Sequence, residues 1–178
     1  MSARLELDVI VDFPAWLDAV PTAEAFCRRS AVAAFHAAAE ALPHAGTDPW
    51  TEVEGSVVLS GDAQVKVLNA AYRGKDEATN VLAFPATDLT QVRPLEPPPP
   101  LMIGDVIVAF ETAAAEAALE GKDLADHLSH LVVHGMLHLL GYDHRTEIEA
   151  EEMERLEVAV LASLGVADPY SVASIDPK

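Results

Sequence analysis

The sequence lacks the features of a secreted or membrane-spanning protein. Its single cysteine, Cys27, cannot form an intramolecular disulfide, which fits a reducing cytosol. No uncharged apolar run reaches the roughly 20 residues that span a bilayer. Charges at Arg4, Glu6 and Asp8 interrupt any apolar core of a signal peptide. We therefore expect a soluble, cytoplasmic protein with no membrane partner.

Positive charge is also scarce. The chain has 11 Lys and Arg residues against 29 Asp and Glu residues, which gives a net charge of 11 − 29 = −18. This balance argues against a protein that coats nucleic acid through bulk positive charge, but it leaves room for a local basic path. Apolar residues, in contrast, make up 51% of the 178 positions, which excludes wholesale disorder. The length predicts a single domain over residues 1–178.

The order of predicted elements indicates an α+β fold. Apolar alternation and short apolar runs predict four strands, at residues 5–11, 53–60, 79–84 and 101–110. Helical periods and capping residues predict five helices, at residues 22–42, 62–74, 111–120, 124–140 and 146–164. Residues 43–49 and 86–100 are expected to be loops. Because strands and helices do not alternate strictly, we expect a small mixed β-sheet packed with helices.

Histidines are concentrated near the end of the fourth predicted helix. Five of the seven fall between positions 127 and 144. His134 and His138 are four residues apart, so on a helix they lie one turn apart on the same face. Gly141 is suited to ending that helix in a left-handed conformation, which would let His144 return to the same ion. Three nitrogen ligands with one open position are typical of a catalytic zinc site.

Spacing alone leaves other ligand sets and other enzymes open. His127 and His130 share an arc of about 80° with His134 and His138, so either is a candidate fourth ligand that would close the site. The ligand spacing also matches that of metzincin peptidases, H-E-x-x-H-x-x-G-x-x-H. However, Gly135 stands where those enzymes have the glutamate that acts as general base. This difference counts against a peptidase.

Three segments of the chain are distinctive: LNAAYRGKDEATNVLAFP (residues 68–85), IGDVIVA (103–109) and HGMLHLLGYDH (134–144). They resemble the central block, the following strand and the signature of the YbeY family of bacterial ribosomal RNA maturation factors, and they occur in the same order as in that family. The DPY tripeptide at 168–170 adds to the likeness, which covers most of the chain from about Leu59 onward. Ala83 departs from the family, which commonly has serine before the Phe-Pro pair.

The resemblance implies a zincin-like α+β domain and a zinc-dependent, single-strand-specific endoribonuclease, which is a hydrolase. Its implied role is late-stage maturation of ribosomal RNA at the 3′ end of 16S rRNA, together with ribosome quality control. The implied partners are single-stranded RNA and the small ribosomal subunit or its associated proteins. Carried onto this chain, the likeness implies one Zn²⁺ held by His134, His138 and His144, and a catalytic Arg73.

The charged residues suggest how an acidic chain would meet RNA. Four cations precede the histidine motif, and we expect them to make the cleft locally positive: Lys66, Arg73, Lys75 and Arg93. The last predicted helix carries a run of glutamates that is most simply a solvated face: Glu147, Glu149, Glu151, Glu152, Glu154 and Glu157.

The general base and the functional class stay open at this point. Asp143, next to a ligand, is a candidate for orienting a histidine, and the substrate 2′-OH is a possible nucleophile. The alternatives to the nuclease are a ribosome-assembly factor in which zinc is mainly structural, and a metal-dependent hydrolase of another substrate.

Overall fold

The protein is described here from a computed structural model that covers residues 3–39, 52–89 and 99–171. The elements follow in this order: β1 (Arg4–Val11), α1 (Ala15–Ala19), α2 (Ala23–Ala39), β2 (Glu52–Ser60), α3 (Asp62–Arg73), β3 (Val81–Pro85), β4 (Leu101–Ala109), α4 (Phe110–Glu120), α5 (Leu124–Leu139) and α6 (Glu147–Ser163).

The four strands form one mixed sheet in the order β1-β2-β4-β3. β1, β2 and β4 pair in parallel, whereas β3 is antiparallel to β4 and forms the opposite edge from β1. This sheet, with helices packed on it, confirms the predicted α+β class. The five-residue helix α1 was not predicted, because one turn and a half is too short to show a helical period in the sequence.

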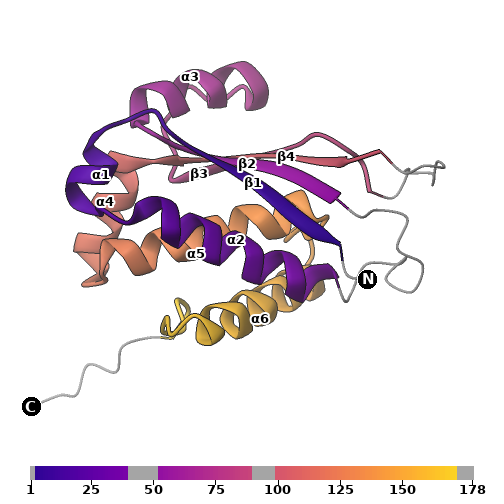
Figure 1. The fold of residues 1–178 in the computed structure, drawn as a ribbon. Coiled ribbons are helices and arrows are strands. Elements are labelled where there is room, and N and C mark those ends of the chain that lie inside the picture. Colours follow the sequence, from indigo (N-terminus) through magenta and orange to yellow (C-terminus); the bar gives the residue numbers. More distant parts are fainter. Residues whose placement is uncertain (1–2, 40–51, 90–98, 172–178) are drawn as a thin grey trace, which may run out of the picture.

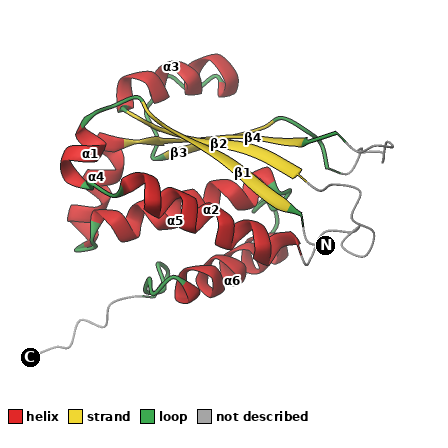
Figure 2. Cartoon of the chain, in the orientation of Figure 1, coloured by secondary structure: helices red, strands yellow, loops and turns green. Residues whose placement is uncertain are grey.

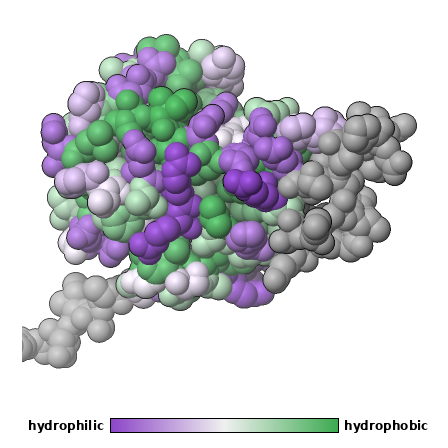
Figure 3. Space-filling view, viewed as in Figure 1, coloured by the Kyte–Doolittle hydropathy of each residue, from purple (hydrophilic) through white to green (hydrophobic). Residues whose placement is uncertain are grey.

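Helices lie on both faces of the sheet, as Figures 1 and 2 show. α3 covers one face, α2 and α5 cover the other, and α6 packs beyond α2 and α5 as a further layer. β4, the strand between β2 and β3, is buried on both faces at most positions, as expected for a strand covered from both sides. The face seen in Figure 3 mixes polar and apolar residues.

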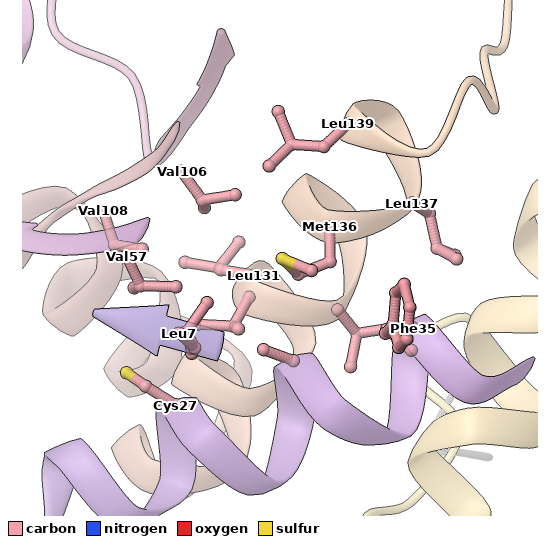
Figure 4. Packing of buried hydrophobic residues seen from close by; sticks show 14 of the residues in the cluster. Leu7, Cys27, Phe35, Val57, Val106, Val108, Leu131, Met136, Leu137 and Leu139 are labelled. Carbon is pink, nitrogen blue, oxygen red and sulfur yellow. The ribbon is translucent and has the colours of Figure 1, made fainter. Parts of the chain in front are cut away.

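The main core lies between the sheet and the pair α2 and α5. Figure 4 shows side chains of the strands, such as Val57 and Val106, converging with Phe35 of α2 and Met136 of α5. A smaller cluster fills the opposite face beneath α3. α5 is therefore buried over most of its circumference, which fixes the helix that carries the histidine motif.

α5 approaches the sheet closely at Gly135. A Cβ atom at this position would lie 2.6 Å from Cγ1 of Val106, a branched and stiff side chain of β4. Position 135, where metzincin peptidases have their general base, therefore faces the core, and a glutamate side chain does not fit there. This geometry gives a physical reason for the glycine and weakens the peptidase alternative.

Some sequence-based expectations fall partly outside the described residues. The loop expected at 43–49 lies outside them, as do residues 90–98 of the loop expected at 86–100. A single domain over residues 1–178 stays a prediction, because residues 1–2, 40–51, 90–98 and 172–178 are not described. Cys27 is a buried free thiol. None of the helices that the structure describes is long and apolar enough to cross a membrane.

Gly135→Ala should destabilise the protein. Forcing a methyl group against Val106 costs about 1–3 kcal/mol, and the better helix propensity of alanine returns only about 1 kcal/mol. We expect a net loss of up to about 2 kcal/mol in the free energy of unfolding, measured by chemical denaturation. The double variant Gly135→Ala with Val106→Ala removes the contact, so the two substitutions should cost less together than the sum of their separate costs. Additive losses would show that this contact does not limit the packing.

Candidate metal centre

The end of α5 places the three motif histidines close together. The helix begins at an N-cap, Asp123, whose side chain accepts a hydrogen bond from the Ala125 N–H at 2.8 Å. Beyond its last turn, Gly141 adopts a φ of +97°, a value that L side chains rarely take. The N–H of Gly141 donates to the carbonyl of His138 at 3.1 Å. This turn reverses the chain and brings His144 back toward the helix, as the sequence predicts.

The three histidines form the one potential metal-binding group of this kind in the described part of the chain. One ligand atom from each of His134, His138 and His144 lies within 4.8 Å of the others. The ring centroids are 4.6 Å apart for His134 and His138, 5.0 Å for His138 and His144, and 5.8 Å for His134 and His144. His144 is exposed, and the other two are half-buried, so the group opens to solvent on one side.

Hydrogen bonds fix the protonation of two of these rings. Nδ1 of His138 lies 3.0 Å from the carbonyl oxygen of Tyr142, which only accepts, so Nδ1 carries the proton. Nδ1 of His134 donates to the carboxylate of Glu157. Both Nδ1 atoms are therefore engaged, and the two Nε2 atoms face each other at 3.1 Å. A neutral ring with its proton on Nδ1 offers its lone pair at Nε2, so the arrangement fits two ligands of one metal ion.

Burial keeps His138 in the form that binds metal. It lowers the pKa of this ring, and the nearby His134 and His144 rings lower it further, to about 4. His138 is therefore neutral at pH 7, with a lone pair available at Nε2.

Glu157 lies in a different environment from the one predicted. It was predicted to lie on the solvated face of the last helix, yet its side chain is 0% exposed. Burial by itself would raise the pKa of Glu157, but the neighbouring His130 and His134 rings outweigh it and lower the pKa to about 2. The signal was present in the helical period, because Glu157 shares a face of α6 with the buried Met153 and Leu161. The other glutamates of the predicted run are exposed, as expected.

Tyr170 holds the other oxygen of the Glu157 carboxylate. Its hydroxyl donates to Oε2 of Glu157, and Nε2 of His130 lies 3.8 Å from the same oxygen. The backbone N–H of Tyr170 donates to the side chain of Asp168 at 2.8 Å, which shapes the turn after α6. The DPY tripeptide thus packs the segment after α6 against the carboxylate that orients His134.

The candidate fourth ligands have other partners. Nε2 of His127 lies 2.8 Å from the carboxylate of Glu116, which also accepts a hydrogen bond from Asn80. His130 faces Glu157 and Tyr170. Neither histidine belongs to the group formed by His134, His138 and His144. Among the described residues, the group therefore has three histidines and not four.

The predicted cations lie on other elements. Arg73 is the last residue of α3, exposed, on the face of the sheet opposite α5. Lys75 follows two residues later and is also exposed. Lys66 lies 3.8 Å from the carboxylate of Asp76. Arg93 falls outside the described residues. Among the described residues, these cations form no hydrogen bond or ion pair with the three histidines.

Asp143 does not orient a histidine ring in this structure. Its carboxylate accepts a hydrogen bond from the backbone N–H of His144 at 2.8 Å and pairs with Arg145 at 2.7 Å. The bond from the His144 N–H is the main reason that the pKa of Asp143 is lowered. A carboxylate with a lowered pKa is a weak base, so Asp143 is not suited to accepting a proton.

Comparisons with known proteins show which family the chain resembles. A family model described as "Endoribonuclease YbeY" matches residues 26–165. A protein from Paramagnetospirillum magneticum named endoribonuclease YbeY is 52% identical over 170 residues, covering 96% of this chain and 98% of its own. A protein of the same name from Azorhizobium caulinodans is 46% identical over 168 residues, covering 94% of this chain and 98% of its own.

A solved structure supports the fold. The solution structure of a Thermotoga maritima protein is similar to this chain with a TM-score of 0.54 and 18% sequence identity. The alignment covers 97% of this chain and 100% of that one. At this level of identity the likeness concerns the fold alone.

Glu157→Gln should weaken metal binding while leaving the three histidines in place. The amide is close in shape to the carboxylate but uncharged, so it no longer strengthens His134 as a ligand. Loss of such a partner typically lowers metal affinity 10- to 100-fold. The affinity is measured by competition with a chromophoric chelator.

Glu154→Gln, on the exposed side of the same helix, is the matched control and should leave metal affinity unchanged. Equal affinities for the Glu157 variant and the wild type would rule out the role assigned to this carboxylate.

Proposed function

The chain belongs to the endoribonuclease YbeY family, and on this premise we propose that it is a zinc-dependent endoribonuclease that cuts single-stranded RNA. In this proposal His134, His138 and His144 hold the zinc ion. The observation that carries the proposal is the pair of Nε2 atoms, from His134 and His138, that face each other at 3.1 Å. Hydrogen bonds at both Nδ1 atoms hold the rings in this orientation.

Zinc suits the donor set. Three imidazole nitrogens with an open position are the ligands of catalytic zinc, and none of the three is a carboxylate of the kind that magnesium or calcium prefers. When bound, zinc supplies Lewis acidity for charge that builds on phosphate oxygens and lowers the pKa of water. The chain's own contribution is to present neutral nitrogens from a helix that packing holds rigid.

Arg73 is assigned to the phosphate. A guanidinium group binds two oxygens of a phosphate at once, which positions the backbone and stabilises its charge. Arg73 is exposed at the end of α3, with no ion-pair partner among the described residues, so its donors are available to a substrate. Because α3 and α5 cover opposite faces of the sheet, we infer that the RNA passes round the β3 edge to reach both.

The general base is neither of the two carboxylates nearest the histidines, Glu157 and Asp143. Glu157 is held by His134 and Tyr170, and Asp143 by the His144 N–H and Arg145. Position 135 has no room for a side chain. These constraints favour the 2′-OH of the substrate or a water molecule as nucleophile, without a carboxylate at the position used by metzincins.

The substrate is ribosomal RNA, and the proposed step is late maturation at the 3′ end of 16S rRNA together with ribosome quality control. Family membership supports this assignment. The net charge of −18 opposes free association with RNA, so the small subunit or its associated proteins would present the substrate in the cytoplasm.

Two alternatives are less well supported. A structural zinc in an assembly factor would be closed by a fourth ligand, whereas His127 and His130 are engaged elsewhere. A peptidase would need a general base at position 135, where the packing of Val106 leaves no room.

Two variants should distinguish loss of the metal from loss of cleavage. His138→Ala should lose bound zinc and therefore activity, whereas Arg73→Glu should keep one zinc per chain and lose cleavage of single-stranded RNA. Zinc is measured by mass spectrometry and cleavage by gel on the same preparations. His36→Ala and Arg155→Glu, which change exposed residues on other helices, are the controls and should behave as wild type. A wild-type protein that holds zinc but cuts no RNA, alone or with ribosomes, would contradict the proposal.

Lys75→Glu should weaken RNA binding and flatten its dependence on salt. Each lysine or arginine that contacts a phosphate adds about one to the slope of log affinity against log salt concentration, so this change should lower the slope by roughly one. Binding is measured by fluorescence anisotropy at several salt concentrations. Arg155→Glu makes the same change in net charge from an exposed site on α6 and should leave the slope unaltered. Equal slopes for the Lys75 variant and the wild type would remove Lys75 from the binding path.

A further inference from the structure

Tyr72 is an aromatic residue whose side chain lies mostly in solvent. Its side chain is 71% exposed, near the end of α3, and its hydroxyl has no hydrogen-bond partner among the described residues. An exposed tyrosine leaves a large apolar ring in water, where it contributes little to folding. The surface of α3 at the top of Figure 3 carries both polar and apolar residues. The exposed face of the Tyr72 ring is therefore accessible to a ligand.

The Tyr72 ring is nevertheless held in place. It lies against Phe84 of β3, with the ring centroids 5.2 Å apart and the planes inclined at 59°. Phe84 packs in turn on the small core cluster beneath α3, which includes Val65 and Leu82. The two rings thus form a fixed aromatic surface with one side open to solvent.

The turn beside this surface is also fixed. The N–H of Gly74 donates to the Ala70 carbonyl at 3.2 Å, and that of Lys75 to the Asn69 carbonyl at 3.3 Å. The buried side chain of Asn69 donates to the Glu77 carbonyl at 2.8 Å. These bonds hold the backbone that carries Arg73 and Lys75 next to Tyr72.

Charge at this place favours a polyanion. Residues 62–77 contain three of the eleven basic residues and three acidic ones, so this segment is neutral (3 − 3 = 0) in a chain whose net charge is −18. Arg73 and Lys75 have no ion-pair partner in the part of the chain that the structure describes. An exposed aromatic ring flanked by unpaired cations is the combination by which proteins hold single-stranded nucleic acid.

The position of β3 connects this surface with the metal centre. β3 is an edge strand whose side chains alternate between the two faces: Leu82 and Phe84 pack under α3, while Val81 and Ala83 pack on the side of α5. A strand of RNA that leaves the Tyr72 surface needs to cross only this one strand to reach the face on which α5 lies (Figure 1).

We propose that Tyr72, supported by Phe84, is a stacking site for one base of single-stranded RNA, adjacent to phosphate contacts made by Arg73 and Lys75. The proposal rests on the proposed nuclease function and adds a substrate subsite to it. Stacking is tolerant of base identity, so the site would fix the path of the strand without selecting a sequence.

The test measures binding of a single-stranded RNA that carries 2-aminopurine, whose fluorescence falls when the base stacks. The zinc-loaded wild type is compared with Tyr72→Ala and Tyr72→Phe over a range of salt concentrations. Tyr72→Ala should bind about 5- to 150-fold more weakly, lose the fluorescence change, and keep the wild-type salt slope, because stacking involves no charge. Tyr72→Phe keeps the ring and should bind within about 2-fold of wild type.

Leu119→Ala is the matched control, because it removes an apolar side chain that is 90% exposed on α4, and it should bind as wild type. Zinc content and melting temperature confirm that each variant is folded. Wild-type affinity in Tyr72→Ala, or a loss in Tyr72→Phe as large as in Tyr72→Ala, would overturn the stacking site while wild-type cleavage still upheld the nuclease. A wild-type protein that neither binds nor cuts the RNA would overturn the nuclease and the stacking site together.

Discussion

The contact between the buried Glu157 carboxylate and Nδ1 of His134 is the interaction on which the metal centre depends. A carboxylate without access to water is costly unless hydrogen bonds replace its hydration. Here His134 and Tyr170 donate to its two oxygens, and His130 lies nearby. The same contacts join α5, α6 and the segment after α6, so the need to satisfy one buried charge ties the end of the fold to the metal ligands.

The rest of the structure holds the two residues of that contact in position. α5 is buried against the sheet on one side and against α2 and α6 on others, and it approaches β4 so closely that only glycine fits at position 135. The capping box of Thr146 and Glu149 starts α6 directly after the turn that carries His144. Helix ends at both sides of this turn therefore set the positions of His144 and Glu157 relative to α5.

The sequence predicted that His134, His138 and His144 come together, and it predicted most elements, because both depend on local spacing. The four-residue separation of His134 and His138 and the left-handed Gly141 are local features, and the Thr146 cap is another. Glu157 was misplaced because charge was given more weight than its position on the buried face of α6. α1 was not predicted, because its five residues are too few to show a helical period in the sequence. The relation of Arg73 to the histidines could not be predicted, because it depends on which face of the sheet each helix covers.

The most direct test of this account is the protonation of the histidine rings in the metal-free protein. Long-range ¹⁵N–¹H correlation spectra at neutral pH distinguish a proton on Nδ1 from one on Nε2. The account requires His134 and His138 to be neutral, with the proton on Nδ1 in each. A proton on Nε2 of both rings would mean that the lone pairs point away from each other, and that the site is not organised for a metal ion before the ion binds.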